Sequence, residues 1–246
     1  MKKKRASLIL TGGLVVAVII VGLTLALLQT TTGTKTNVFS SNKNIAIQLR
    51  EPEWDGYEFE DAKPGDGTTA KPDYENDKNL GVNQAKSYLP GQIIPKNPKV
   101  KNNAAGGEGV ETYVAIKVQY YKGDVDNEDQ VDYDTFKKTF LKETGITIND
   151  TWACIKESTS DDPYNLSAIY LYGINNKGTV TGTKLAVGAE TTTLFDHVPL
   201  SPNIQADPET NLLPSFNIKV QAYAIQTLGI KEEDIQQTML DFIKAN

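Results

Sequence analysis

Apolar and polar residues alternate along several stretches of this chain, with the period of two that is typical of a half-buried β-strand. The longest are "VETYVAIKVQYY" (110–121) and "SFNIKVQAYAIQ" (215–226), and the shorter ones are "NIAIQL" (44–49), "TWACIK" (151–156), "LSAIYLYG" (166–173), "TKLAVG" (183–188) and "TTLFDHV" (192–198). In the two long stretches, one face is predicted to hold Val114, Ile116, Val118 and Tyr120, and Phe216, Ile218, Val220, Ala222 and Ala224.

Two stretches show helical spacing instead. In "VDYDTFKKTFLKE" (131–143), Phe136 and Phe140 are four residues apart and lysines occupy the opposite face. The last stretch, 229–246, carries an apolar stripe of Ile235, Met239, Leu240, Phe242 and Ile243. Several strands separate the two helices, so the order predicts an antiparallel β-sandwich with two short peripheral helices, not a doubly wound α/β fold. Residues 43–246 read as one domain.

Proline and glycine mark the segments between these elements. Residues 50–79 are dense in proline, glycine and charge, which predicts a long surface excursion. The stretch "YLPGQIIPKNPKVKN" (88–102) has strand-forming residues but three prolines. Because Pro95 and Pro98 cannot donate a main-chain hydrogen bond, we predict an edge strand or a corner where the chain crosses between sheets.

The N-terminus has the layout of an export signal or of an inside-positive membrane anchor. Basic residues 2–5 precede the uncharged residues 6–28. Thr24 and Ala26 supply small side chains for a signal-peptide cleavage after Ala26. We therefore expect residues 1–26 to be a signal peptide, or else a retained anchor, followed by a flexible segment over 27–42. In either case the rest of the chain lies outside the cytoplasm.

The net charge argues against two classes of partner, and the cysteine count argues against a disulfide within the chain. Residues 1–26 contain four of the 25 basic residues and none of the 31 acidic residues, so the remainder has a net charge of −10. An acidic domain of this kind is not attracted to nucleic acid or to anionic lipid. Cys154 is the only cysteine, so no disulfide can form within the chain.

The residues that could carry catalysis do not form a recognisable set. His197 is the only histidine and no HExxH motif is present, whereas hydrolytic zinc sites commonly use two or three histidines. Cys154 lies in a predicted strand, and we expect a buried, inert thiol instead of a nucleophile paired with His197. The sequence therefore predicts a protein that is not an enzyme and has no cofactor.

An acidic loop, "GDVDNEDQVDYD" (123–134), is the one candidate for a cation site. Read as an EF-hand from Asp124, it places Asp129 where glycine is required and Thr135 where the bidentate glutamate belongs. The motif fails on both counts. Two interpretations stay open, a weak Ca²⁺ site and a solvated loop that caps the following helix.

Several stretches, in order, resemble the camelysin/TasA family of exported proteins of monoderm bacteria. They are "TLA" (24–26) with "NVF" (37–39), "IQLREPEWDG" (47–56), "LPGQIIPKNPKVKN" (89–102) with "YVAIKV" (113–118), "YLYG" (170–173), "AVGAETTTLFDHV" (186–198) and "FNIKVQAYAIQ" (216–226). The resemblance implies a jelly-roll-like sandwich, a dedicated signal peptidase as a partner during export, and, as in some members, assembly into fibres of the extracellular or biofilm matrix.

Two functions follow as expectations. The first is a surface or matrix protein whose N-terminal segment, including Asn37, Val38 and Phe39, adds as a strand to another subunit; the same segment could instead be only a tether. The alternative is a monomeric binding or adhesion module for a glycan or a protein. This alternative rests on aromatic residues expected to be exposed on loops, namely Trp54, Tyr57, Tyr74 and Tyr88.

Overall fold

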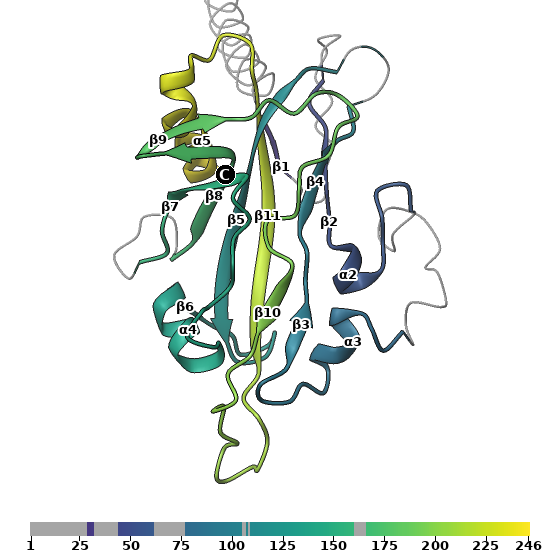
Figure 1. Ribbon diagram of the computed structural model, residues 1–246, viewed down its shortest axis with the longest axis vertical. Helices are drawn as coiled ribbons and strands as arrows, with labels where there is room; N and C mark the ends of the chain where they lie inside the picture. The colour runs from purple at the N-terminus through teal and green to yellow at the C-terminus, as the bar shows by residue number, and fades with distance from the viewer. Residues whose placement is uncertain (1–28, 32–43, 62–76, 105–106, 108, 160–165) are drawn as a thin grey trace, which may run out of the picture.

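A computed structural model describes residues 29–31, 44–61, 77–104, 107, 109–159 and 166–246 of the chain. The fold is mainly β, and its larger sheet is built around β5 (Thr112–Lys122) (Figure 1). On one side β5 pairs over its whole length with β11 (Phe216–Gln226). On the other side it pairs with β8 (Ala168–Asn176), which pairs in turn with β7 (Trp152–Lys156). All of these pairings are antiparallel.

Three short strands extend this sheet. β1 (Gln29–Thr31) pairs with the outer edge of β11, and β6 (Asp129–Val131) pairs with the end of β5. β9 (Thr179–Gly182) folds back on β8 through Lys177 and Gly178, which both have positive φ (52° and 91°). Positive φ at both central residues is the signature of a type I′ turn, whose twist matches that of a hairpin.

Two strand pairs form the second layer of the sandwich. β2 (Ile47–Arg50) pairs with β4 (Lys99–Asn102), and β3 (Ile93–Pro95) pairs with β10 (His197–Pro199). The main core lies between this layer and the large sheet, where Val114, Ile116 and Val118 are fully buried. The predicted β-sandwich is therefore confirmed, as is the predicted inward face of β5.

The opposite face of the large sheet is also covered. α5 (Ile235–Ala245), preceded by a 3₁₀ turn η2 (Glu232–Asp234), packs there through the apolar stripe seen in the sequence (Figure 1). Tyr113 and Ala115 of β5, which alternate with the inward residues, are buried under this helix cluster. The first half of β5 is thus buried on both faces. Its alternate side chains point into two different apolar clusters, and neither face is open to solvent.

The second predicted helix is confirmed as α4 (Tyr133–Phe140), and Asp132 caps its N-terminus. The Asp132 carboxylate accepts hydrogen bonds from the Thr135 main-chain N–H at 2.9 Å and from the Thr135 hydroxyl at 2.8 Å. These bonds satisfy a donor that the helix itself leaves unpaired. They also hold the pKa of Asp132 below its usual value, because they favour the ionised carboxylate.

We predict that Asp132→Ala lowers the free energy of unfolding by about 1 kcal/mol at neutral pH. Because the folded-state pKa is lowered, this contribution is complete above the unfolded pKa of about 3.9 and is lost as the pH falls through the folded value. Urea unfolding at neutral and at strongly acid pH should show the difference between wild type and variant shrinking with acid. Asp126→Ala, an exposed residue in the preceding loop, is the control; an equal loss there would contradict the capping role.

Three sequence-based expectations were wrong. The structure contains two further helices, α2 (Pro52–Asp55) and α3 (Gly81–Ala85), so there are four helices among the described residues and not two. Part of the expected surface excursion belongs to the core, since Tyr57 and Phe59 are buried. The stretches 183–188 and 192–198 are mostly irregular among the described residues: an isolated bridge at Leu185 and the start of β10 form there. Leu194 and Phe195 are both buried, although strict alternation would place them on opposite faces.

The proline-rich stretch is a corner between strand pairs, as predicted. Its first part pairs as β3 with β10, and its last part pairs as β4 with β2. Between them, Lys96 is buried and forms an ion pair with Glu51 at 2.7 Å. The Asn97 side chain accepts the main-chain N–H of Glu53 at 2.8 Å, which holds α2 against the corner. The corner therefore positions a helix as well as turning the chain.

No helix within the described residues is both long and apolar enough to span a membrane. The predicted signal or anchor and its cleavage point after Ala26 lie outside those residues.

Candidate functional site

The outer edge of β11 is the surface most directly related to the predicted strand addition. β1 covers only its last part, with Gln29, Thr30 and Thr31 opposite Ile225, Ala224 and Tyr223. Within the described residues, no strand pairs with the outer edge from Phe216 to Gln221. An exposed row of main-chain donors and acceptors is a template for pairing with another strand.

Main-chain hydrogen bonds at the two ends of β11 define which residues face this edge. Gly123 donates its main-chain N–H to Ser215 O, and Thr227 donates to Glu111 O, so residues 215 and 227 face β5. Because main-chain groups alternate along a strand, the even-numbered residues of β11 face outward. The main-chain groups of Phe216, Ile218 and Val220 are therefore the ones directed at the part of the edge without a strand partner among the described residues.

The register of β1 shows how far the N-terminal segment could reach along this edge. Each pairing moves one residue forward in β1 and one residue back in β11. If a strand continued in that register, Thr34 would lie opposite Val220, Thr36 opposite Ile218 and Val38 opposite Phe216. The self-assembly candidates Asn37, Val38 and Phe39 themselves lie outside the described residues.

Three aromatic residues expected on exposed loops are buried or partly packed against the protein. Tyr57 is buried, and Trp54 is half-buried with Lys96 Nζ at 4.6 Å from its ring centroid. Tyr88 donates its hydroxyl to Pro214 O at 2.6 Å and packs edge-on against Phe216. The expected exposure is therefore wrong for Tyr57, and Trp54 and Tyr88 are only partly exposed because their rings pack against the protein. Binding of a glycan or a protein stays a prediction from the sequence. Tyr74 lies outside the described residues.

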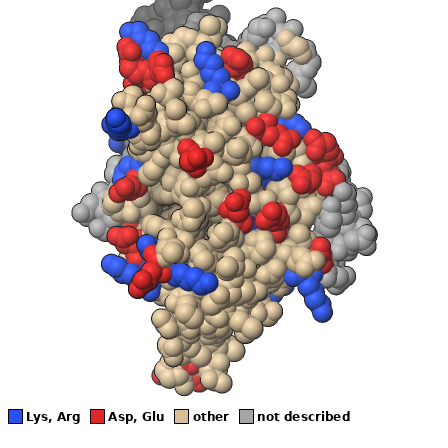
Figure 2. All heavy atoms as spheres, viewed as in Figure 1, with Lys and Arg blue, Asp and Glu red and all other residues tan. Residues whose placement is uncertain are grey.

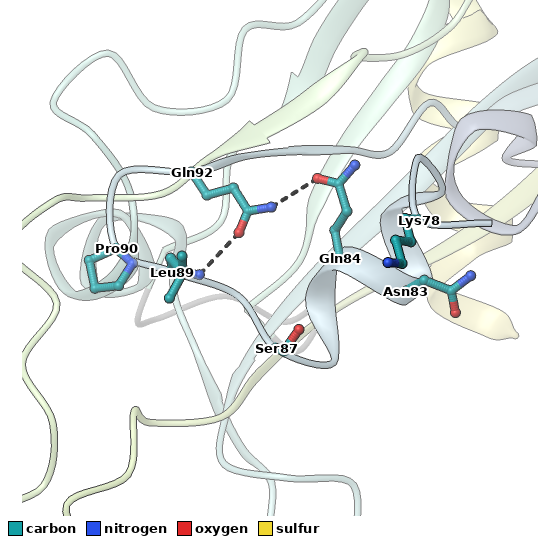
Figure 3. Close-up of a pocket in the computed structure, with 7 residues that line it drawn as sticks. All are labelled: Lys78, Asn83, Gln84, Ser87, Leu89, Pro90 and Gln92. Atoms are coloured by element: carbon teal, nitrogen blue, oxygen red, sulfur yellow. Dashed lines mark hydrogen bonds between the residues drawn. The ribbon is translucent and has the colours of Figure 1, made fainter. Parts of the chain in front are cut away.

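A pocket of about 550 Å³ opens between α3 and the turn before β3. Figure 3 shows its polar side chains directed at one another. Gln92 donates to the side-chain oxygen of Gln84 at 2.9 Å and accepts the main-chain N–H of Leu89 at 3.0 Å. Asn83 donates to Asp77 O. These groups join a short helix to a turn, which leaves few polar atoms free for a ligand.

Cys154 and His197 lie on different layers of the sandwich. Cys154 is on β7 of the large sheet, while His197 is on β10, opposite Pro95. Both side chains are exposed, so the expectation of a buried thiol was wrong. The sulfur is nevertheless at a cavity wall, where partial desolvation raises the pKa of the thiol and disfavours the nucleophilic thiolate.

In the acidic loop, Asp124 accepts the main-chain N–H groups of Asp126 and Asn127 at 3.2 and 3.0 Å. Its carboxylate thus stabilises a turn. Within the part of the chain that the structure describes, no three His, Cys, Asp or Glu side chains are grouped as a cation site. Weak Ca²⁺ binding stays a prediction from the sequence.

Charged groups of both signs are interspersed on the face shown in Figure 2. Lys99 and Lys101 of β4 both pair with Glu190, at 3.5 and 3.2 Å. They also pair with Glu58 and Glu60, at 3.0 and 2.6 Å. These pairs connect the segment after α2 to the second layer and neutralise the lysines of β4.

Comparison with protein-family models, with curated proteins and with solved structures finds no match to this chain.

Proposed function

We propose that this protein is an exported structural component of the cell surface or extracellular matrix, and that it assembles by strand addition along the outer edge of β11. The observation that supports this proposal is the partly covered outer edge of β11: β1 already pairs there with residues 223–225. From Phe216 to Gln221, no strand among the described residues pairs with that outer edge, while the inner edge pairs with β5. The uncharged N-terminal run, the acidic remainder and the resemblance to matrix-forming exported proteins agree with it.

In this assembly, residues 29–38 of one subunit pair with β11 of the next in the register that β1 shows. Main-chain hydrogen bonds supply most of the affinity, since strand addition depends little on side-chain identity. Thr34, Thr36 and Val38 would direct their main-chain groups at β11, because even-numbered residues of β1 lie opposite even-numbered residues of β11. Val38 would add an apolar side chain near Phe216.

Proline substitutions test this register in residues 27–246. Thr34→Pro combined with Thr36→Pro removes two N–H groups that would bond to β11. Lys35→Pro, the matched control, removes an N–H that points away from it. Sedimentation and negative-stain microscopy from micromolar concentration upward should show filaments for the wild type and for Lys35→Pro, and none for the double variant.

Each outcome has a defined meaning. Filaments from the double-proline variant would refute strand addition by this segment. A wild-type protein that stays monomeric under all conditions would refute assembly and favour the binding-module alternative. Circular dichroism of each variant tests whether the fold is intact. We expect no change, since residues 34–36 precede the sandwich in the chain.

A further inference from the structure

A second cavity, of about 480 Å³, lies where the start of α4 meets β7 and β8 (Figure 1). Its lining combines two kinds of side chain that are far apart in sequence. The aromatic ones are Tyr120, Tyr133, Trp152 and Tyr170, and the acidic ones are Asp134, Asp150 and Glu157. Among the residues that the structure describes, this lining contains no lysine, arginine or histidine.

The aromatic side chains are held in place by contacts outside the cavity. The Tyr133 hydroxyl accepts the main-chain N–H of Ile146 at 2.9 Å, and its ring centroid lies 5.0 Å from that of Tyr120. Trp152 donates its ring N–H to Thr192 O at 3.3 Å and packs against Tyr172. Tyr120 and Tyr170 are buried, and their burial raises the pKa of both hydroxyls. Tyr120, Trp152 and Tyr170 are buried at 1%, 4% and 9% exposure and form the floor of the cavity, so the half-buried Tyr133 is the ring most open to a ligand. These rings are in place before any ligand arrives.

The carboxylates at this cavity form no side-chain ion pair within the part of the chain that the structure describes. Asp134, Asp150 and Glu157 are exposed, and none of them forms an ion pair with a described basic residue. Lys156 is the basic neighbour in sequence, and its ammonium group donates to the main-chain oxygen of Glu157 at 2.7 Å. This contrasts with β4, where the lysines and glutamates neutralise one another.

We propose that this cavity binds an organic ammonium ion, either a free amine or the side chain of a lysine residue. Aromatic faces attract a cation through their quadrupole, and more strongly where water is partly excluded. Carboxylates at the same cavity add attraction at close range. A neutral sugar would stack on the rings but would not need three uncompensated carboxylates. This site is separate from the β11 edge and does not depend on the proposed assembly.

Trp152 is a direct reporter of this site. The chain has two tryptophans, so Trp54→Phe leaves Trp152 as the sole one. Fluorescence titration of that variant with Nα-acetyl-lysine methylamide should show saturable binding at or below about 10 mM, which suits a small single-site ligand. Tetramethylammonium tests a free cation without a peptide backbone. Nα-acetyl-norleucine methylamide, similar in shape but uncharged, should bind at least about fivefold more weakly.

Variants around the cavity distinguish the contribution of the carboxylates to binding from that of the aromatic rings. Asp150→Asn and Glu157→Gln should each weaken binding of the lysine probe about two- to fivefold, as expected for exposed charges. Tyr133→Phe keeps the ring and should bind nearly as well as the parent, whereas Tyr133→Leu should bind at least about fivefold more weakly. Glu143→Gln, exposed and outside the cavity, should change nothing.

Three results would overturn the proposal. They are equal binding of the lysine and norleucine probes, absence of any saturable change with either cation, and preferential binding of a neutral sugar such as N-acetylglucosamine. Binding of the lysine probe without binding of tetramethylammonium would support the site and assign it to a side chain carrying N–H donors. An unchanged affinity for the lysine probe in Asp150→Asn combined with Glu157→Gln would refute the role of the carboxylates.

Discussion

Replacing Phe136 with alanine should lower the free energy of unfolding by about 3–5 kcal/mol, the largest loss we expect from a single core substitution. Phe136 is fully buried at the centre of an aromatic cluster. Its ring centroid lies 5.0 Å from Tyr120, 5.2 Å from Phe140 and 5.6 Å from Phe216. This cluster joins α4 to both β5 and β11, so alanine would leave a cavity where the helix packs on the paired strands.

Urea unfolding followed by circular dichroism measures this loss. Lys138→Ala is the matched control, because Lys138 is exposed on the same helix and the substitution favours helix formation slightly. We expect the control to remain within about 0.5 kcal/mol of the wild type. A loss below about 1 kcal/mol for Phe136→Ala would mean that the cluster repacks around the missing ring.

Replacing Asn102 with alanine should cost about 2–4 kcal/mol, although asparagine is not a core residue by type. Its side chain is fully buried and donates to Val110 O at 2.9 Å and to Leu185 O at 3.1 Å. These bonds hold the end of β4 to the approach to β5 and to the segment around Leu185. Alanine would leave buried carbonyl groups short of a donor, and each such group carries a desolvation cost.

Thermal and urea unfolding of Asn102→Ala should be compared with Asn103→Ala. Asn103 is exposed, and its main-chain N–H donates to Ala46 O, a bond that alanine retains. The control should therefore unfold nearly as the wild type does. Equal stability of the two variants would show that water replaces the Asn102 side chain without penalty.

The sequence predicted this fold best where an alternating stretch forms a long strand that pairs with another along its full length. β5 and β11 each carry an uninterrupted alternation, and the structure pairs them along their full length. The same signal failed for residues 183–188, where Leu185 is buried but Val187, two residues on, is exposed. There, Leu185 exchanges two main-chain hydrogen bonds with Thr112 in an isolated bridge, and no ladder forms. Alternation alone does not determine where main-chain hydrogen bonds go.

The two missed helices and the candidate sites have a different explanation. α2 and α3 are four and five residues long, too short for a periodic signal. Asn97 holds α2 from a distant part of the chain, which no local pattern reveals. The same holds for the β11 edge and for the aromatic cavity: strand order brings Tyr120, Tyr133 and Tyr170 together, and strand order depends on long-range pairing.

The pairing of β5 with β11 also determines when the protein can fold. The two strands are separated by about a hundred residues of chain, and such non-local pairing slows folding. β5 can pair with β6 and β8 earlier, but its longest ladder must wait until residue 226 has been synthesised. During most of its synthesis the chain therefore lacks the strand that completes its main core, so the native sheet can close only when nearly the whole chain is available.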